Sequence, residues 1–285
     1  MDHIGEFFPD SPIWFRWLGR LAAPMFFYAL AVGVQHTRNR KKYLLRLYLA
    51  NVGMVFFNQI MCMLQRKLDY VAYQPKNHNI FTTLFCAGVL ICIWENRKEK
   101  KKFFTYIGIY IFWQAMVMGL AILAEAFDYI WRGNALLQTV LRTNYIFPLL
   151  GGIWDAEGGM FFIVLGVWLY CAVENKWKLA LRYILFCGAY MFMCQGDILY
   201  RIMSRFSFWG YHKLADVIYF GSSFVGIPLG TSDLSLLTEF YQWMMIGALP
   251  IMLACNGKRG KSLKWLFYAA YPLQFLVLYG ISYYK

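Results

Sequence analysis

Apolar residues along this chain come in long uninterrupted blocks, without the regular polar positions of an amphipathic surface helix. Three blocks, at 103–124, 265–284 and 47–65, contain no charged residue over 22, 20 and 19 positions. An α-helix needs about 20 predominantly apolar residues to cross the hydrocarbon core of a bilayer. The pattern therefore predicts membrane-spanning helices.

The same pattern, followed along the whole chain, predicts an all-α polytopic transmembrane bundle of about eight spans. We expect one transmembrane domain covering residues 1–285, with spans at 13–35, 43–64, 78–94, 103–124, 159–173, 179–196, 236–255 and 263–284. Two further stretches, 144–158 and 217–232, are interrupted by glycine and proline. We predict that they are interfacial or re-entrant segments buried against protein, because bare backbone is not tolerated in lipid.

Charge sets the predicted orientation. Only 15% of the residues are charged, against roughly 25% in a soluble domain. Of the 28 basic residues, 16 lie in four short clusters between apolar blocks, at 38–42, 97–102, 176–182 and 258–264. Short basic loops stay on the cytoplasmic side and meet anionic lipid. We therefore expect a multi-pass protein of the cell membrane, of the bacterial inner-membrane kind, with an extracytoplasmic C-terminus and membrane lipids rather than nucleic acid as partners.

Cysteine and histidine indicate no metal. The seven cysteines lie within or at the ends of apolar blocks without a CxxC pair, and the four histidines lack the HExxH spacing. We predict neither a disulfide framework nor a metal site.

Polar residues within predicted spans are the candidates for function, because the membrane disfavours them. Arg20 lies about 10 Å into the first span at 1.5 Å per residue. Burying an arginine there costs about 2.5–3.5 kcal/mol on insertion scales, so it needs a partner or must reach the headgroups. Pro24 cannot donate a hydrogen bond to the Arg20 carbonyl and should bend the helix. Asn51, Asn58 and Gln65 recur every seven residues on one helical face, and either line a polar cavity or bond between helices.

Several motifs together resemble the TraX family of membrane acyltransferases. They are DHIG at 2–5, GRLAAPMFFYAL at 19–30, GVQHTRNRKKYLLRL at 33–47, NIFTTL at 79–84 and FYAAYPLQFLVLYG at 267–280. The family is named for a protein that N-acetylates the amino terminus of a conjugative pilin. The resemblance implies transfer of an acetyl group from cytoplasmic acetyl-CoA to an amine or hydroxyl of a peptide or glycan at the outer face.

The resemblance also implies roles for individual residues. Asp2 and His3 would form an acid-oriented histidine base, with Arg20 as the intramembrane cation of the catalytic site. Acetyl-CoA would be bound at the inner face by a group rich in cations: His36, Thr37, Arg38, Arg40, Lys41 and Arg46. A polar cavity would be lined by Asn51, Asn58 and Asn79.

Two departures from the family keep alternatives open. The chain starts just before the DHIG motif and apparently lacks the first helix typical of the family, and Gln274 stands in YPLQ where a histidine is expected. The alternatives are a transporter that moves a small anionic solute past Arg20 and the Asn51 face, or a non-catalytic membrane assembly factor.

Overall fold

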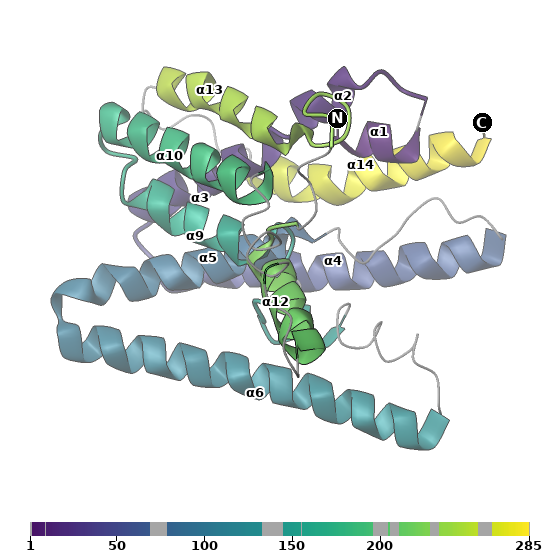
Figure 1. The fold of residues 1–285 in the computed structure, drawn as a ribbon, viewed down its shortest axis with the longest axis horizontal. Helices are drawn as coiled ribbons and strands as arrows, with labels where there is room; N and C mark the ends of the chain where they lie inside the picture. The colour runs from purple at the N-terminus through teal and green to yellow at the C-terminus, as the bar shows by residue number, and fades with distance from the viewer. Residues whose placement is uncertain are drawn as a thin grey trace. The chain divides into compact units, whose positions relative to one another are not determined.

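The computed structural model describes residues 2–8, 10–68, 79–132, 145–154, 156–195, 205, 211–228, 234–255 and 264–284. The described residues are helices and connecting turns, with no strand among them (Figure 1), which confirms the all-α prediction. The elements are α1 (Asp2–Phe7), α2 (Trp14–Gly19), α3 (Ala22–His36), α4 (Arg40–Leu68), α5 (Ile80–Glu95), η2 (Asn96–Lys98), α6 (Lys100–Arg132), α8 (Phe147–Leu149), α9 (Gly159–Tyr170), α10 (Lys176–Gln195), α12 (Tyr211–Val225), η4 (Tyr241–Gly247), α13 (Ala248–Ala254) and α14 (Lys264–Tyr284).

Six of the expected spans are confirmed as helices long and apolar enough to cross a membrane. In the described residues these are Trp14–His36, Arg40–Gln65, Ile80–Lys98, Lys100–Ala124, Lys176–Gln195 and Leu266–Tyr284. The other two expected spans are shorter apolar helices, Gly159–Tyr170 and Tyr241–Ala254. At 1.5 Å per residue a 12-residue helix extends about 18 Å, less than the roughly 30 Å hydrocarbon core. The count of eight spans is therefore not confirmed.

A bend was predicted near Pro24, and the helix is interrupted just before it. α2 ends at Gly19, Arg20 and Leu21 form a turn, and α3 starts at Ala22. Pro24 lies in the first turn of α3, where a missing backbone N–H is tolerated. The interruption places the Arg20 side chain at a junction between two helices.

The chain divides into two compact units. Unit 1 comprises Met1–Val32 and Gly158–Lys258, and unit 2 comprises Gly33–Glu157 and Arg259–Lys285. In unit 1, the Phe27 and Phe162 rings pack with centroids 5.9 Å apart, and the buried Tyr183 donates a 2.5 Å hydrogen bond to the Met245 carbonyl. These contacts join α3, α9, α10 and η4 around one core.

At the start of α9 in unit 1, the backbone at Gly158–Gly159 packs closely against the backbone at Gly226. Gly159 and Gly226 both have positive φ, and a Cβ on Gly226 would lie 2.3 Å from the Gly158 carbonyl oxygen. Only glycine permits both the left-handed conformation and this contact. Gly226 follows α12, so residues 217–225 of the predicted interfacial stretch are helical; residues 229–232 lie outside the described residues.

In unit 2, α4 packs along α5, and α5 turns through η2 into the 33-residue α6, which runs back beside it (Figure 1). The segment 145–157 contains the short α8 and is otherwise mostly irregular. Phe147, Gly151 and Ile153 are buried within it. Burial against protein is confirmed for six residues of the predicted stretch 144–158, whereas Gly158 is exposed; Asn144 and Asp155 lie outside the described residues. The six are Phe147, Pro148, Gly151, Gly152, Ile153 and Ala156.

Side chains of the neighbouring helices satisfy the backbone of this irregular segment. Carbonyl oxygens of Pro148, Leu149, Leu150, Gly151 and Glu157 accept hydrogen bonds from Asn51, Tyr48, Trp113, Gln114 and Thr83, at 2.7, 2.7, 2.9, 3.1 and 3.0 Å. The donors come from α4, α5 and α6. An apolar environment requires such pairing, because an unsatisfied backbone group there costs several kcal/mol.

Candidate functional site

The DHIG motif of α1 lies against Arg16 in unit 1. Arg16 of α2 donates one hydrogen bond to the Gly5 carbonyl at 2.6 Å and another to the Tyr241 hydroxyl at 2.9 Å. A Cβ on Gly5 would lie 2.6 Å from Arg16 Cγ, so the glycine of the motif allows the arginine to pass. We call Gly5, Arg16, Arg20 and Tyr241 the arginine cluster.

Arg20 contacts the same tyrosine. Its Nη2 lies 3.5 Å from the Tyr241 hydroxyl, and its Cζ lies 4.9 Å from the centre of the Tyr241 ring. Tyr241 is 8% exposed, so this cation–π contact is inside unit 1. Tyr190 of α10 is also within electrostatic range of the Arg20 charge. Two guanidinium groups on one buried hydroxyl form a positive site suited to an anionic ligand or to developing negative charge.

The two other predicted catalytic residues lie beside this cluster in sequence. Asp2 and His3 form the start of α1, which packs against α2, and His3 is half-buried. The Asp2 side chain lies outside the described part of the structure, so its pairing with His3 stays a prediction.

The predicted acetyl-CoA group lies at the end of α3 and the start of α4, and one of its cations is already engaged. Arg40 forms a two-point ion pair with Glu95 at the end of α5, with Nη2–Oε1 and Nε–Oε2 distances of 3.1 and 3.4 Å. Arg40 also donates to the Thr37 carbonyl. Arg40 therefore joins α4 to α5.

Three other members of the predicted group, His36, Arg38 and Lys41, are exposed. Lys42 is exposed too, and its backbone N–H donates to the Asn39 side chain, which caps the start of α4. Exposed cations next to a helix start fit the phosphates of a CoA-type ligand.

Arg46 lies two turns into α4. Its Cζ is 5.7 Å from the Tyr43 ring centre, and its Nε is buried without a hydrogen-bond partner among the described residues. A buried donor without an acceptor fits an anionic ligand, so the predicted group remains compatible with CoA at this position.

Two of the three predicted polar cavity residues, Asn51 and Asn79, contact each other. Asn51 is fully buried and makes three side-chain hydrogen bonds: it donates to the Pro148 carbonyl, and its Oδ1 accepts from Asn79 Nδ2 at 2.8 Å and Thr82 Oγ1 at 2.7 Å. These contacts support the alternative in which Asn51 bonds between helices. Asn58 is also buried, two turns further along α4.

A carboxylate missed by the sequence reasoning lies at the end of the irregular segment. Glu157 Oε2 accepts a 3.2 Å hydrogen bond from Tyr271 of α14, and Tyr271 packs edge-on against Phe81 at 5.4 Å. Two features of the sequence could have indicated this pair: Glu157 is an acidic residue at the end of an apolar stretch, and Tyr271 is the tyrosine of the YPLQ motif. Gln274 of that motif is half-buried.

Comparison with protein families finds one match. The model of the family described as TraX protein matches residues 1–188, which is more than half of the 285-residue chain. The matched part includes α1 to α6 and most of α10, but not Tyr241 or Tyr271. Comparison with curated proteins finds no match, and neither does comparison with solved structures. The chain therefore belongs to the TraX family, and its described residues include six helices long and apolar enough to cross a membrane.

Proposed function

We propose that this protein is a membrane acetyltransferase that moves an acetyl group from cytoplasmic acetyl-CoA to an amine or hydroxyl acceptor at the outer face. The observation that carries the proposal is membership of the TraX family, known for a pilin acetylase. The arginine cluster supports it, because Arg16 joins Gly5 of the DHIG motif to Tyr241, and Arg20 contacts the same tyrosine.

The reaction breaks the thioester C–S bond of acetyl-CoA and forms a C–N or C–O bond to the acceptor. His3, when neutral, accepts the proton that the amine or hydroxyl loses and later returns it to the departing thiolate. Asp2 orients that histidine. Arg16 and Arg20 stabilise the negative charge that develops on the carbonyl oxygen, because fixed donors in a dry site need no reorganisation.

The exposed cations at 36–42 and Arg46 hold the phosphates of the donor. Arg40 is assigned to the ion pair with Glu95 instead. The acceptor is a peptide or a glycan, and membrane lipid surrounds the spans.

A thiol-release assay tests the proposal. The full-length protein in lipid nanodiscs is supplied with acetyl-CoA and a panel of peptide amines and sugar hydroxyls, and free CoA thiol is measured. We expect acceptor-dependent release that falls by about 10²–10⁴-fold in His3→Gln, the usual contribution of a general base. Arg20→Gln should lower release by about 10²-fold, and Arg20→Lys by less.

The matched control is Lys178→Gln, an exposed cation on α10 outside the arginine cluster. Release equal in wild type and His3→Gln, with both proteins folded, would remove His3 from the mechanism. Absence of release with every acceptor, together with no exchange between acetyl-CoA and labelled CoA, would count against the enzyme assignment itself.

A further inference from the structure

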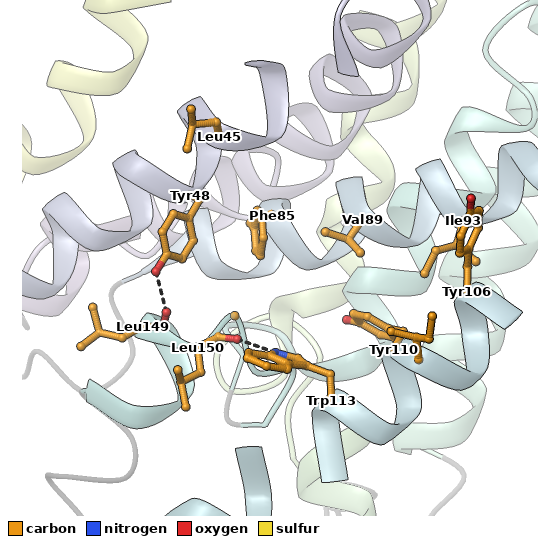
Figure 2. Close-up of a pocket in the computed structure, with 12 residues that line it drawn as sticks. Leu45, Tyr48, Phe85, Val89, Ile93, Tyr106, Tyr110, Trp113, Leu149 and Leu150 are labelled. Carbon is orange, nitrogen blue, oxygen red and sulfur yellow. Dashed lines mark hydrogen bonds between the residues drawn. The ribbon is translucent and has the colours of Figure 1, made fainter. Parts of the chain in front are cut away.

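A long apolar groove lies along unit 2. It has a volume of about 750 Å³ and is lined by side chains of α4, α5, α6 and the segment 149–151 (Figure 2). α5 contributes Phe85, Val89 and Ile93, one residue per turn, and α6 contributes Tyr106, Ile109, Tyr110 and Trp113. From Phe85 to Ile93 the helix rises about 12 Å at 1.5 Å per residue, so the groove runs parallel to the spans for that distance.

The walls of the groove are mostly hydrocarbon, and their polar side-chain groups are the hydroxyls of three tyrosines and the Trp113 indole N–H. Tyr48 and Trp113 turn their polar atoms toward the Leu149 and Leu150 carbonyls, as the dashed lines in Figure 2 show, at 2.7 and 2.9 Å. These bonds close the end of the groove at the irregular segment. An occupant therefore meets apolar faces along most of its length.

The groove is open at the surface of unit 2. Ile109 is 60% exposed, and Trp113 and Leu45 are exposed as well. Only 17% of the most apolar part of span Lys100–Ala124 is buried, the lowest share of the six candidate spans. In a membrane-spanning helix, such a surface faces lipid.

The other end of the groove lies next to a basic turn. Ile93 is two residues before the end of α5, and Tyr106 lies in the second turn of α6, so both are close to the turn at 95–102. This turn carries five basic and two acidic side chains. Glu95 pairs with Arg40 and Glu99 pairs with Lys102, whereas Lys98, Lys100 and Lys101 are exposed. Positive charge at one end and hydrocarbon along the rest match an anionic amphiphile.

The open side of the groove suits a hydrocarbon chain. The groove is lined by apolar side chains of three helices and continues onto the exposed apolar surface of α6, so an acyl chain can enter it from the surrounding lipid.

From these observations we infer that unit 2 carries a binding site for an anionic glycerophospholipid, with an acyl chain in the groove and the phosphate at Lys98 and Lys101. This site is separate from the proposed acetyl transfer and does not depend on it. The negative phosphate is attracted to basic side chains at the membrane surface. The acyl chain exchanges its contacts with bulk lipid for van der Waals contacts with the side chains that line the groove.

Native mass spectrometry of the full-length protein tests the site. Protein taken from nanodiscs containing equal amounts of dioleoyl phosphatidylglycerol and dioleoyl phosphatidylcholine is examined for retained lipid. We expect phosphatidylglycerol to be retained in about 5–30-fold excess, the size expected for one to two basic side chains near an anionic headgroup at about 1 kcal/mol each. Replacing Lys98 and Lys101 together by glutamine should remove this preference, whereas Lys176 and Lys178 replaced together should keep it.

The groove has a closely matched control on the same helix. Ile109 lines the groove and is 60% exposed, and Ile111, two residues on, is 61% exposed and does not line it. Ile109→Trp should lower retained phosphatidylglycerol at least as much as the lysine pair does, and Ile111→Trp should leave it unchanged. Equal retention of the two lipids by the wild type, or equal behaviour of the two tryptophan variants, would overturn the inference.

If Ile109→Trp does not fold, the wild type still decides the question. Trp113 lines the groove, so lipids brominated on the acyl chain should quench its fluorescence, read as the difference between wild type and Trp113→Phe. Quenching stronger with brominated phosphatidylglycerol than with brominated phosphatidylcholine supports the site. Equal quenching by the two contradicts it.

Discussion

Asn51 shows how a single side chain organises this membrane domain at the residue scale. Its amide joins α4 to the Pro148 carbonyl of the irregular segment and to Asn79 and Thr82 at the start of α5. A hydrogen bond between membrane helices contributes about 0.6 kcal/mol on average and up to about 1.7. Three such bonds on one fully buried side chain make Asn51 a structural residue.

Asn51→Ala should lower the free energy of unfolding by about 2–4 kcal/mol, from three lost hydrogen bonds and a cavity. Unfolding in mixed detergent micelles with increasing dodecyl sulfate measures the change. Thr105→Ala is the control, since the exposed Thr105 bonds only to the Lys101 carbonyl of its own helix, and its effect should stay within about 0.5 kcal/mol. If Asn51→Ala lowers the free energy of unfolding no more than the control does, Asn51 is not a structural residue, and the alternative in which it lines a cavity is favoured.

Gly151 is the second residue on which the irregular segment depends. Its φ is +64°, and a Cβ would lie 2.7 Å from the Phe85 ring. Gly151→Ala should therefore destabilise the protein by at least about 1–2 kcal/mol, the cost of a left-handed residue alone. Gly108 of α6 has open space around its Cβ position, so Gly108→Ala should stabilise by up to about 1 kcal/mol. Thermal unfolding in detergent measures the stability of both variants. If Gly108→Ala destabilises the protein as much as Gly151→Ala does, the effect of Gly151→Ala cannot be assigned to the irregular segment.

At the scale of elements, the Arg40–Glu95 ion pair joins α4 to α5. Arg40 therefore has a structural role, unlike the neighbouring cations that are proposed to bind acetyl-CoA. Both side chains are about one-third exposed, 34% and 28%. A partly exposed two-point pair should give a coupling energy of about 0.5–1 kcal/mol in a double-mutant cycle with Arg40→Gln and Glu95→Gln. We expect the two single variants to bind acetyl-CoA alike. Weaker binding in Arg40→Gln alone would assign Arg40 to the ligand instead.

The helices that sequence reasoning placed well are those with long uninterrupted apolar windows, because length and apolarity are sufficient for a span. The two that proved shorter depend on local breaks. α13 starts at Ala248, which puts Pro250 in a first turn, and α9 starts at the Gly158–Gly159 turn that packs on Gly226. Apolar content alone does not reveal such starts.

The candidate site was predictable only in part for a different reason. Arg20 stands out in sequence because a charge within a span is costly. Its partner Tyr241 lies 221 positions away, and Tyr271 lies 114 positions from Glu157. Contacts over such separations leave no periodic signal in one sequence, so only the fold identifies these tyrosines.

At the scale of the whole molecule, the predicted catalytic residues lie in unit 1, and the predicted acetyl-CoA residues, from His36 to Arg46, lie in unit 2. The family match covers residues of both units. The central claim is the proposal that this chain binds acetyl-CoA and transfers its acetyl group.

Equilibrium binding of acetyl-CoA to the purified full-length protein in nanodiscs tests that claim most directly. We predict saturable binding by the wild type, at least about tenfold weaker in Arg46→Gln, because this guanidinium is proposed to hold a phosphate of the donor and a lost charged bond costs about 1.5–3 kcal/mol. Lys178→Ala should bind like the wild type, and thermal unfolding should show all three proteins folded. Absence of binding by the folded wild type, or identical affinity in wild type and Arg46→Gln, would contradict the account.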